Sequence, residues 1–595
     1  MVTYQAPLDD IRFVMFDLLD YDARVASLPP YGEAAADLVD SVLEEGARFC
    51  EQELLPLNRS GDEEGCRFEN GVVYTPEGFK DAYRRFAEGG WVGVSAANDY
   101  DGQGLPNSVY FAFSELMCST NLSFGIYPGL THGAYDAIEH WADDELKNTY
   151  LPRLASGEWA GTMNLTEPHA GTDLGLIRSR AEPQDDGSYR ITGTKIFISG
   201  GEQDLTENII HLVLAKLPDA PPGTKGISMF LVPKFLVNED GSLGARNGVF
   251  CGSIEHKMGI KASSTCVMNY DEAIGYLVGE RHGGMKAMFT MMNEARLLVG
   301  MQGLGLAETA YQSAVAYAKE RHQGRSLAGP KAPDKPADPI IVHPDVRNHL
   351  LTMRAINEAS RALALWIGLE IDVAKHHTDP KERQQADDLV QLMTPIIKAF
   401  FTDHGTDAAN RGVQIFGGHG YIREWGMEQL IRDARIAQLY EGANGIQALD
   451  LVGRKMGQGM GRLLRRFFHP VQGFIDIHQS DATLGEFTPA LAKAFGRLQQ
   501  ATVVIAQRGL AAPEEAGAAA SDYLRLFALV ALAFMWARMV AVAAPKANGK
   551  GNDFYRAKLD TARFFYARVL PETSMLFARV MAGKASVMAP ADETF

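Results

Sequence analysis

A carboxylate next to two glycines is the residue pattern in this sequence that could most directly do chemistry. Glu441 lies within residues 440–445, where Gly442 and Gly445 allow positive φ and close approach of another molecule to the backbone. A glutamate held on a short loop can act as a general base, and an apolar substrate that displaces water from it makes it a stronger one. Ordinary helix boundaries share this pattern, so both interpretations stay open on these residues alone.

A second segment with chemical potential is 163–173, Met-Asn-Leu-Thr-Glu-Pro-His-Ala-Gly-Thr-Asp. Its small and hydroxyl-bearing residues leave backbone N–H groups available to an anion or to the polar edge of a ring, as in a phosphate-binding nest. Thr166 and Thr172 place two hydroxyls six residues apart, a spacing that suits the two ends of an extended cofactor. A solvated loop is the alternative interpretation.

The elements around Glu441 are predicted to be helices. Residues 427–436 upstream and 446–455 downstream carry apolar residues at helical spacing, and the second stretch ends in a basic turn. The pattern therefore places Glu441 on a loop between two helices.

The periodicity of the whole chain predicts an α+β fold that is mainly helical. We expect five parts: an N-terminal extension (1–36), an N-terminal helical domain (37–159), a middle β domain (160–283), a helical bundle with Glu441 (284–460) and a C-terminal helical domain (461–595). In the β domain we expect strands at 188–193, 195–199, 209–215 and 226–232, and further strand from 265 to about 278. Long helices are predicted at 285–320, 344–376 and 383–411, and a glycine-rich hinge at 457–461.

The composition excludes some functional classes. A net charge of −17 argues against a nucleic-acid partner, and five scattered cysteines indicate free thiols in a reducing compartment. No zinc motif is present, so we expect no metal site. The N-terminus lacks a signal-peptide pattern. The most apolar stretch, 526–544, is interrupted by Arg538, which favours a buried core helix over a membrane span. We therefore expect a cytoplasmic protein.

Residues 163–173, 411–421 and 438–447 together resemble the acyl-CoA dehydrogenase family, whose signatures are T-E-P-x-A-G-[ST]-D and Q-x-x-G-G-x-G-Y…R-D…Y-E-G. The resemblance covers roughly 37–460. It implies an FAD-dependent enzyme that converts an acyl-CoA thioester to the trans-2-enoyl-CoA. Glu441 would remove the Cα proton while flavin N5 takes a hydride from Cβ. Electrons would then pass to electron-transferring flavoprotein, whereas an acyl-CoA oxidase of the same fold would produce hydrogen peroxide.

The resemblance also assigns residues to the flavin. These are Met163, Leu165, Thr166, Gly171, Thr172, Phe197, Ser199, Arg321, Gln414, Gly417, Gly418, Asn444 and Gly445. Thr166 would touch the pyrimidine edge and Thr172 the pyrophosphate. Most family members have Trp in place of Phe197 and Thr in place of Ser199. Arg321 would bind the pyrophosphate of the neighbouring subunit, which implies a homo-oligomer, at least a dimer.

Substrate contacts are expected from a second set of residues: Phe124, Tyr127, Thr172, Asn293, Arg296, Tyr440 and Gly442. The backbone N–H of Glu441 would donate to the thioester carbonyl. Residues 443–445, Ala-Asn-Gly, depart from the hydroxyl residues and glutamine that are usual in the family. That departure leaves backbone contacts from Asn444 and Gly445 to the cofactor.

The extensions at both ends and the variant 441–445 loop resemble one subgroup of the family. Its members include enzymes that desaturate a short thioether thioester and enzymes for straight acyl chains. We expect 3-methylmercaptopropionyl-CoA as substrate, giving methylthioacryloyl-CoA in dimethylsulfoniopropionate degradation, with medium or long straight chains as the alternative. Phe124 and Tyr127 would close the acyl pocket to long chains. The helical Met288, Met291 and Met292 are more typical of a core than of a thioether site.

Overall fold

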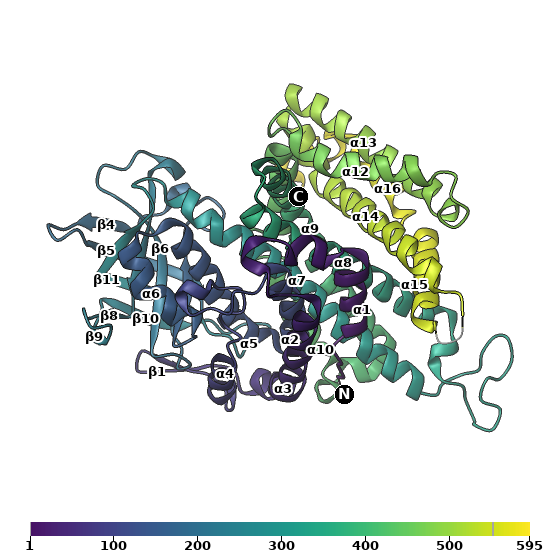
Figure 1. The fold of residues 1–595 in the computed structure, drawn as a ribbon, viewed down its shortest axis with the longest axis horizontal. Helices are drawn as coiled ribbons and strands as arrows, with labels where there is room; N and C mark the ends of the chain where they lie inside the picture. Colours follow the sequence, from purple (N-terminus) through teal and green to yellow (C-terminus); the bar gives the residue numbers. More distant parts are fainter. Residues whose placement is uncertain (1, 550–551) are drawn as a thin grey trace. The chain divides into compact units, whose positions relative to one another are not determined.

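The computed structural model describes residues 2–549 and 552–595, which form two compact units (Figure 1). The β unit comprises Arg48–Leu105 and Thr120–Leu298, and the bundle unit comprises Met1–Ala47, Pro106–Ser119 and Val299–Phe595. Two long helices, α5 (Asn107–Trp141) and α7 (Gly284–Glu320), contribute residues to both units. The α+β, mainly helical fold class is confirmed.

A seven-stranded sheet forms the centre of the β unit. Its strands are β3 (Trp159–Asn164), β4 (Arg180–Pro183), β5 (Tyr189–Ser199), β6 (Asn208–Lys216), β7 (Ile227–Pro233), β10 (Val249–Ile254) and β11 (Thr265–Val278). The order is β10-β11-β5-β4-β6-β3, and β7 pairs with both β6 and β11. These pairings close β11, β5, β4, β6 and β7 into a ring.

The ring of strands has one hydrophobic core inside it and another outside it. The residues of β6 alternate between the two cores. Val213 and Ala215 pack with Ile191 and Phe230 in one core, while Leu212 and its alternate neighbours pack in another core that includes residues of α5 and α6 (Asp144–Ala155). Side chains alternate along a strand, so a strand buried on both faces needs apolar residues at nearly every position. The run at 209–215 meets that requirement.

Two predictions in this unit are wrong in detail. Residues 37–159 are not all helical, because β1 (Arg67–Glu69) and β2 (Val72–Tyr74) form a hairpin. Its turn is Asn70-Gly71, with φ of 52° and 82°, the left-handed pair that a two-residue hairpin turn requires. The strands expected at 188–193 and 195–199 are one strand, β5, because pairing with β11 continues across residues 193–194.

A second hairpin joins β8 (Phe235–Val237) and β9 (Leu243–Arg246).

The helices of the β unit are α3 (Leu55–Glu64), α4 (Phe79–Glu88), α6, the second part of α5 and the first part of α7. Helix α5 breaks at Asn121, whose backbone is non-helical (φ −156°, ψ 88°). The Asn121 side chain then accepts a hydrogen bond from the Phe124 N–H at 3.0 Å, as an N-cap does. The boundary between the two compact units lies between Ser119 and Thr120, directly before this break.

The bundle unit contains the long helices that the periodicity predicts. They are α7, α8 (Pro344–His376) and α9 (Pro380–Phe416), followed by α10 (Met427–Ala437) and α11 (Asn444–Asp450). Its N-terminal helices are α1 (Leu8–Arg12) and α2 (Ala36–Phe49), and its C-terminal helices are α12 (Arg462–His478), α13 (Thr488–Ala511), α14 (Pro513–Lys546), α15 (Asp553–Phe564), α16 (Glu572–Ala582) and α17 (Ala585–Met588).

Helix α14 is the central helix of the C-terminal part and lies alongside α13 and α16 (Figure 1). Its most apolar 18-residue window has a mean hydropathy of 2.2, so by length and composition it could cross a membrane, but 83% of that window is buried within the structure. Trp536 also donates from Nε1 to the Ala355 carbonyl of α8 at 2.9 Å. The prediction of a buried core helix is confirmed.

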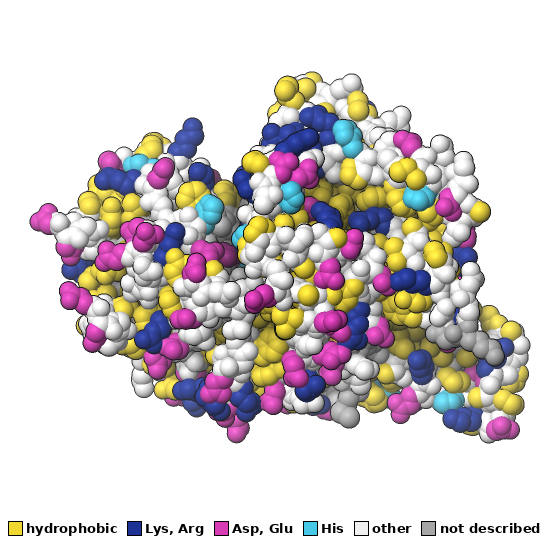
Figure 2. All heavy atoms as spheres, viewed as in Figure 1, with side chains coloured by type: hydrophobic (Ala, Val, Ile, Leu, Met, Phe, Trp, Pro, Cys, Tyr) yellow, Lys and Arg dark blue, Asp and Glu magenta, His cyan; other side chains and the backbone are white. Residues whose placement is uncertain are grey.

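Buried ion pairs tie the N-terminal extension to the rest of the bundle unit. Asp10 of α1 accepts from Arg361 at 2.8 Å and also pairs with Lys558 of α15. Arg361, with 1% exposure, also pairs with Glu115 and Glu308. Both terminal extensions therefore belong to the same compact unit as residues 299–460. The division of the chain into five domains, which the sequence analysis predicts, remains a proposal. On the face shown in Figure 2, acidic and basic side chains are interspersed.

Candidate functional site

The predicted flavin residues of the β unit lie on two adjoining segments, the loop after β3 and strand β5. The loop makes a tight turn in which the N–H groups of Glu167 and Ala170 each donate to the other's carbonyl at 3.0 Å. The Ile196 N–H of β5 donates to the Thr166 carbonyl at 2.9 Å. Leu165 is buried, Met163 and Thr166 are half-buried, and Gly171 and Thr172 are exposed. The structure therefore brings the loop and β5 together.

A buried ion pair, which the sequence analysis missed, holds this loop. Lys195 of β5 has no exposed surface, and its Nζ donates to Glu167 Oε1 at 2.9 Å and to the Leu165 carbonyl at 3.0 Å. The Glu167 carboxylate also accepts from the Arg178 N–H at 2.7 Å and from the Ser179 hydroxyl at 2.6 Å. The sequence did contain a signal for this pair. Lys195 stands at an inward-facing position of an alternating strand, and Glu167 is the acidic residue of the loop motif.

Burial and pairing shift the pKa of both groups. Burial lowers the pKa of Lys195 to about 8, with Glu167 opposing the shift. Burial raises the pKa of Glu167, but Lys195, the Ser179 hydroxyl and the Arg178 N–H outweigh it, so its pKa lies below the usual value. Both groups therefore stay charged at neutral pH, and the charge-assisted bonds fix the loop.

Phe197 is the exposed aromatic residue of β5. Ile198 pairs with Cys266 and Lys195 pairs with Met268, so Ile196 and Phe197 together face the single residue Val267. In this bulge Phe197 has φ of 59°, and its residue surface is 60% exposed. Bulges of this kind often redirect a side chain beside a functional site.

An exposed ring on a rigid strand fits a flat cofactor such as a flavin. Phe197 offers an apolar face, and half-buried Ser199 lies two residues further along the strand with a hydroxyl. The exposed Thr172 and Gly171 add a hydroxyl and an open backbone for a phosphate group. The donor set of the β unit therefore matches FAD.

Asn293 and Arg296 lie one turn apart on α7. Arg296 donates to the Asn293 side-chain oxygen at 3.3 Å, and its guanidinium lies 5.7 Å from the centre of the Phe289 ring. Arg296 is 8% exposed and Asn293 is half-buried. The structure thus brings these two predicted substrate residues together, with the arginine already oriented by a neighbour.

A titratable cluster lies beside them in the β unit. His132 Nδ1 is 3.1 Å from Glu294 Oε1 and 3.9 Å from Asp136 Oδ2, and His132 Nε2 is 2.6 Å from the Ser95 hydroxyl. Burial and repulsion from Asp136 raise the pKa of Glu294 to about 7, although His132 opposes the shift. These side chains offer three possible metal-ligand atoms within 4.8 Å of one another.

Phe124 and Tyr127 are both buried. The Phe124 ring packs against those of Phe79, Tyr83 and Phe86, with centroids 5.5–6.1 Å away. The Tyr127 hydroxyl donates to the Ala262 carbonyl at 3.2 Å and accepts from the Ser264 N–H at 2.9 Å. Both residues have structural partners, and their role in closing an acyl pocket stays a prediction. The methionines of α7 belong to the hydrophobic core, as predicted.

Glu441 lies in the bundle unit, on the loop between α10 and α11. It is half-buried and has φ of 55°, and Gly442 follows with φ of 87°. Gln447 Nε2 donates to the carbonyl groups of both residues, at 3.1 and 3.2 Å. Asparagine and glycine adopt such a pair of conformations readily in a hairpin turn, as at Asn70-Gly71, whereas a glutamate in the left-handed region is uncommon, and such residues cluster at functional sites.

The neighbours of Glu441 are held by other elements of the same unit. The Tyr440 hydroxyl donates to the Gln302 side chain of α7. The side chain of Asn444 is turned toward α9, where it contacts Lys398, Thr402 and Asp403. The Asn444 side chain is therefore occupied by contacts with α9, and the next residue, Gly445, is exposed.

The remaining predicted flavin residues also lie in the bundle unit and are exposed. They are Arg321, which directly follows α7, Gln414 at the end of α9, and Gly417 and Gly418 just after it. A Cβ atom added at Gly417 or Gly418 would meet no protein atom within 4 Å. These positions are open to another molecule.

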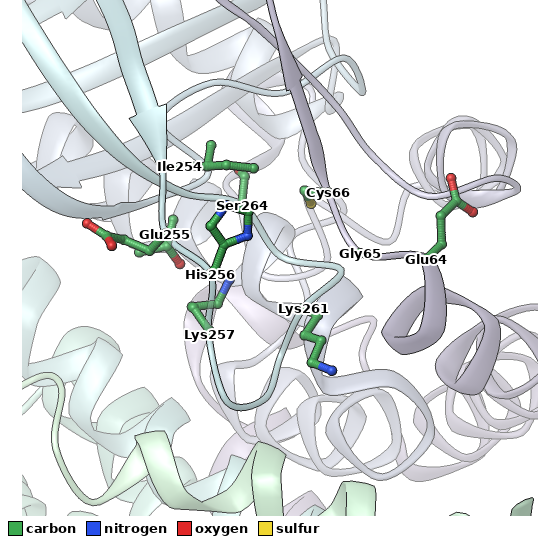
Figure 3. A pocket seen from close by; sticks show the side chains of 10 residues that line it. Glu64, Gly65, Cys66, Ile254, Glu255, His256, Lys257, Lys261 and Ser264 are labelled. Carbon is green, nitrogen blue, oxygen red and sulfur yellow. The ribbon is translucent and has the colours of Figure 1, made fainter. Parts of the chain in front are cut away.

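A pocket of about 270 Å³ in the β unit contains none of the predicted site residues (Figure 3). Residues 64–66, 254–257, 261, 264 and 265 line it. In Figure 3 the side chains of Glu64 and Glu255 point away from the centre of the pocket. Burial raises the pKa of Cys66 to about 11, so this thiol is not a nucleophile at neutral pH. The volume and lining alone indicate no reaction.

Four family models match the chain in succession. They are the acyl-CoA dehydrogenase N-terminal domain (residues 39–158), middle domain (162–273) and C-terminal domain (282–456), and a model described as acetyl-CoA dehydrogenase C-terminal like (467–590). The chain therefore belongs to the acyl-CoA dehydrogenase family of FAD-dependent oxidoreductases.

Individual relatives match almost the whole chain. A 3-methylmercaptopropionyl-CoA dehydrogenase of Ruegeria pomeroyi is 44% identical, covering 97% of this chain and 98% of the relative. A butyryl-CoA dehydrogenase of Syntrophomonas wolfei is 35% identical, covering 96% and 95%. The structure of an acyl-CoA dehydrogenase from Bacillus anthracis complexed with FAD has a TM-score of 0.73 at 21% identity and covers 96% of this chain and 91% of that one. The last likeness shows the fold.

Proposed function

We propose that this enzyme oxidises 3-methylmercaptopropionyl-CoA to methylthioacryloyl-CoA, with Glu441 as the base that removes the Cα proton. The substrate assignment is supported by 44% identity to a 3-methylmercaptopropionyl-CoA dehydrogenase over 97% of the chain, both extensions included. A butyryl-CoA dehydrogenase that is 35% identical over a similar length makes a straight acyl chain the second candidate.

The observation that carries the base assignment is the loop of Glu441. A glutamate held at φ of 55°, with its own carbonyl bonded to Gln447, has a defined backbone direction. A fixed carboxylate avoids much of the orientational entropy that proton removal from a weak carbon acid would otherwise require. The Cα–H bond breaks, its proton goes to the Glu441 carboxylate, and the electron pair forms the new double bond as a hydride leaves Cβ.

FAD, when bound, supplies the acceptor for that hydride. Thr166, Thr172, Phe197 and Ser199 of the β unit would hold it, and the buried Lys195–Glu167 pair described above stiffens the segment that carries them. In this proposal Arg321, Gln414, Gly417 and Gly418 bind the FAD of a neighbouring subunit, so the active form is a homo-oligomer, at least a dimer. Their exposure supports this arrangement.

The thioester and the coenzyme are assigned to the remaining predicted residues. Arg296, oriented by Asn293, provides a cation for the CoA end of the substrate. Tyr440 and Gly442 flank the base, and the backbone N–H of Glu441 would stabilise the enolate-like oxygen that forms as the proton leaves. We further propose electron-transferring flavoprotein as the electron acceptor and the cytoplasm as the location, both on family resemblance.

The base is tested with Glu441→Gln, which preserves side-chain volume but cannot accept a proton. The purified variant should keep its flavin absorbance and its thermal stability while kcat falls to below a few per cent of wild type. A variant that retains more activity than that would place the base elsewhere.

The substrate is tested by kcat/KM for 3-methylthiopropionyl-, butyryl-, octanoyl- and palmitoyl-CoA with an artificial electron acceptor. We expect the thioether substrate to be fastest and palmitoyl-CoA slowest. Butyryl-CoA as the best substrate would favour the straight-chain candidate, and palmitoyl-CoA as the best would end the short-chain assignment. Fast reoxidation of the reduced enzyme by air would instead identify an oxidase.

A further inference from the structure

Lys398 is a buried lysine whose ammonium group is directed at the Glu441 loop. It lies on α9 within the otherwise apolar run 395–401 and has no exposed surface. Its Nζ donates to the Gly442 carbonyl at 2.7 Å and to the Asn444 side-chain oxygen at 2.9 Å. A buried lysine charge needs strong acceptors. Here the loop that follows Glu441 provides two of them.

Asn444 extends the same anchor along one turn of α9. Its amide nitrogen donates to the Ala399 carbonyl at 3.1 Å, to the Thr402 hydroxyl at 3.0 Å and to the Asp403 carboxylate at 2.8 Å. Asp403 also accepts from Gln438 at 2.6 Å. The chain is therefore attached to α9 on both sides of Glu441.

The loop needs such an anchor because its conformation is locally unfavourable. Glu441 carries a Cβ atom in the left-handed region, where it crowds the neighbouring carbonyl, and without restraint it would relax to negative φ. The peptide after Gly442 is fixed by the charged Lys398 donor and by Gln447 Nε2. A charge-assisted bond to this carbonyl is stronger and more directional than a neutral one.

We propose that Lys398 is a positioning residue for the reaction, which holds Glu441 in its left-handed conformation by binding the Gly442 carbonyl and the Asn444 side chain. The proposal rests on the role of Glu441 as base given above. In this assignment Lys398 acts on the reaction through the Gly442 carbonyl and the Asn444 side chain. Its contribution is to the direction of the carboxylate, so its removal should affect proton removal more than binding.

The test uses Lys398→Met in the full-length holoenzyme, because methionine fills similar space without a charge or a donor. We expect kcat per bound flavin to fall about 100-fold, with flavin content and KM within about 3-fold of wild type, since small misplacements of a catalytic group have effects of this size. Asn444→Ala should also lower kcat, by a smaller factor. This variant provides the test if Lys398→Met does not fold.

A matched control is Lys558→Met, which removes another buried lysine of the same unit. Lys558 pairs with Asp10 and Glu358, at the contact between α15, α1 and α8, and not with the loop of Glu441 described above. This control should lower the unfolding temperature but leave kcat per bound flavin unchanged. An equal loss of kcat in Lys558→Met and Lys398→Met would reduce the effect to general destabilisation and overturn the proposal.

The kinetic isotope effect separates positioning from a structural role. With substrate deuterated at Cα, the isotope effect on kcat should increase in Lys398→Met, because proton removal becomes slower than the other steps. In a Glu441→Gln background, Lys398→Met should change the residual rate by less than about 2-fold, because both act on one step. An active Glu441→Gln enzyme would refute the base assignment, whereas an inactive Glu441→Gln with a fully active Lys398→Met would refute only the positioning role.

Discussion

Lys195 and Glu167 form a buried ion pair that joins strand β5 to the loop after β3, with Nζ and Oε1 2.9 Å apart. The lysine has no exposed surface and the glutamate is 3% exposed. Removing one partner of such a pair leaves an uncompensated buried charge, which is far more destabilising than losing a surface pair.

Replacing Lys195 with Met should therefore destabilise the β unit by about 3–5 kcal/mol and weaken flavin retention. The double variant Lys195→Met/Glu167→Gln should recover part of the stability, because it removes the stranded carboxylate. Chemical denaturation and flavin absorbance measure both effects. Arg84→Ala, which breaks the exposed pair with Glu88, should change stability by less than about 1 kcal/mol. A Lys195→Met protein as stable as that control would contradict the argument.

Phe197→Gly should have opposite effects on stability and on cofactor binding. The left-handed backbone at φ of 59° is about 1–2 kcal/mol unfavourable for a residue with Cβ and permitted for glycine. The apoprotein should therefore be as stable as wild type or more stable, while flavin affinity falls because the ring is lost. Thermal unfolding and flavin titration give the two values.

The control for this substitution is Phe250→Gly on β10. Phe250 is another exposed phenylalanine of the same sheet, at 47% exposure, and it is absent from the residues with positive φ. Glycine should lower stability there and leave flavin affinity unchanged. Equal destabilisation at the two positions would mean that the strain at Phe197 is not significant.

Arg321→Ala should lower flavin content and weaken subunit association if this arginine binds the pyrophosphate across a subunit boundary. Loss of a hydrogen bond to a charged group typically amounts to about 1.5–3 kcal/mol. Flavin absorbance and size-exclusion chromatography report the two outcomes. Arg325→Ala is the comparison, because Arg325 bonds the Asp338 carboxylate and the Ala332 carbonyl within its own loop. Full flavin occupancy and an unchanged oligomer in Arg321→Ala would remove Arg321 from the site.

His211 should make the enzyme lose stability in acid. Burial, with Lys234 and Arg246 adding to it, lowers the pKa of His211 to about 3, whereas the unfolded imidazole titrates near 6.5. Between pH 6.5 and 3 the unfolded state binds the extra proton, so stability rises with pH there, by at most about 1.4 kcal/mol per pH unit. His211→Gln should show a shallower decline in unfolding temperature from pH 6.5 to 4.5. Exposed His140→Gln should follow wild type, and identical slopes in all three proteins would contradict the assignment.

Glu294 should make the stability of the folded protein fall as the pH rises, which is the opposite of the effect of His211. With its pKa raised to about 7, the folded protein keeps a proton that the unfolded carboxyl, with a pKa near 4.5, has lost. Its contribution to stability is therefore present below pH 4.5 and is lost as pH rises to about 7. Glu294→Gln should gain stability relative to wild type between pH 5 and 7.5, and exposed Glu239→Gln should not. A constant difference across this range would show that Glu294 does not titrate there.

The sequence by itself determined the features that depend on neighbouring residues. Apolar spacing predicted Pro344–His376 as a helix with the bounds that α8 has. Helical patterns on both sides placed Glu441 on a loop, and the residue types at 209–215 predicted a strand there, which is β6. Local motifs were also enough to identify the family, because its signatures are short and occur in a fixed order.

Only the tertiary structure decided which polar side chains hold the site segments in place. Lys195 and Glu167 are 28 residues apart, and Lys398 and Gly442 are 44 residues apart. The ring of Phe124, whose place at an acyl pocket stays a prediction, packs among the aromatic rings of α4. Local periodicity shows which positions are buried and does not show what they meet there. Contacts between distant segments depend on how whole helices and strands pack, and that information is absent from any single stretch of sequence.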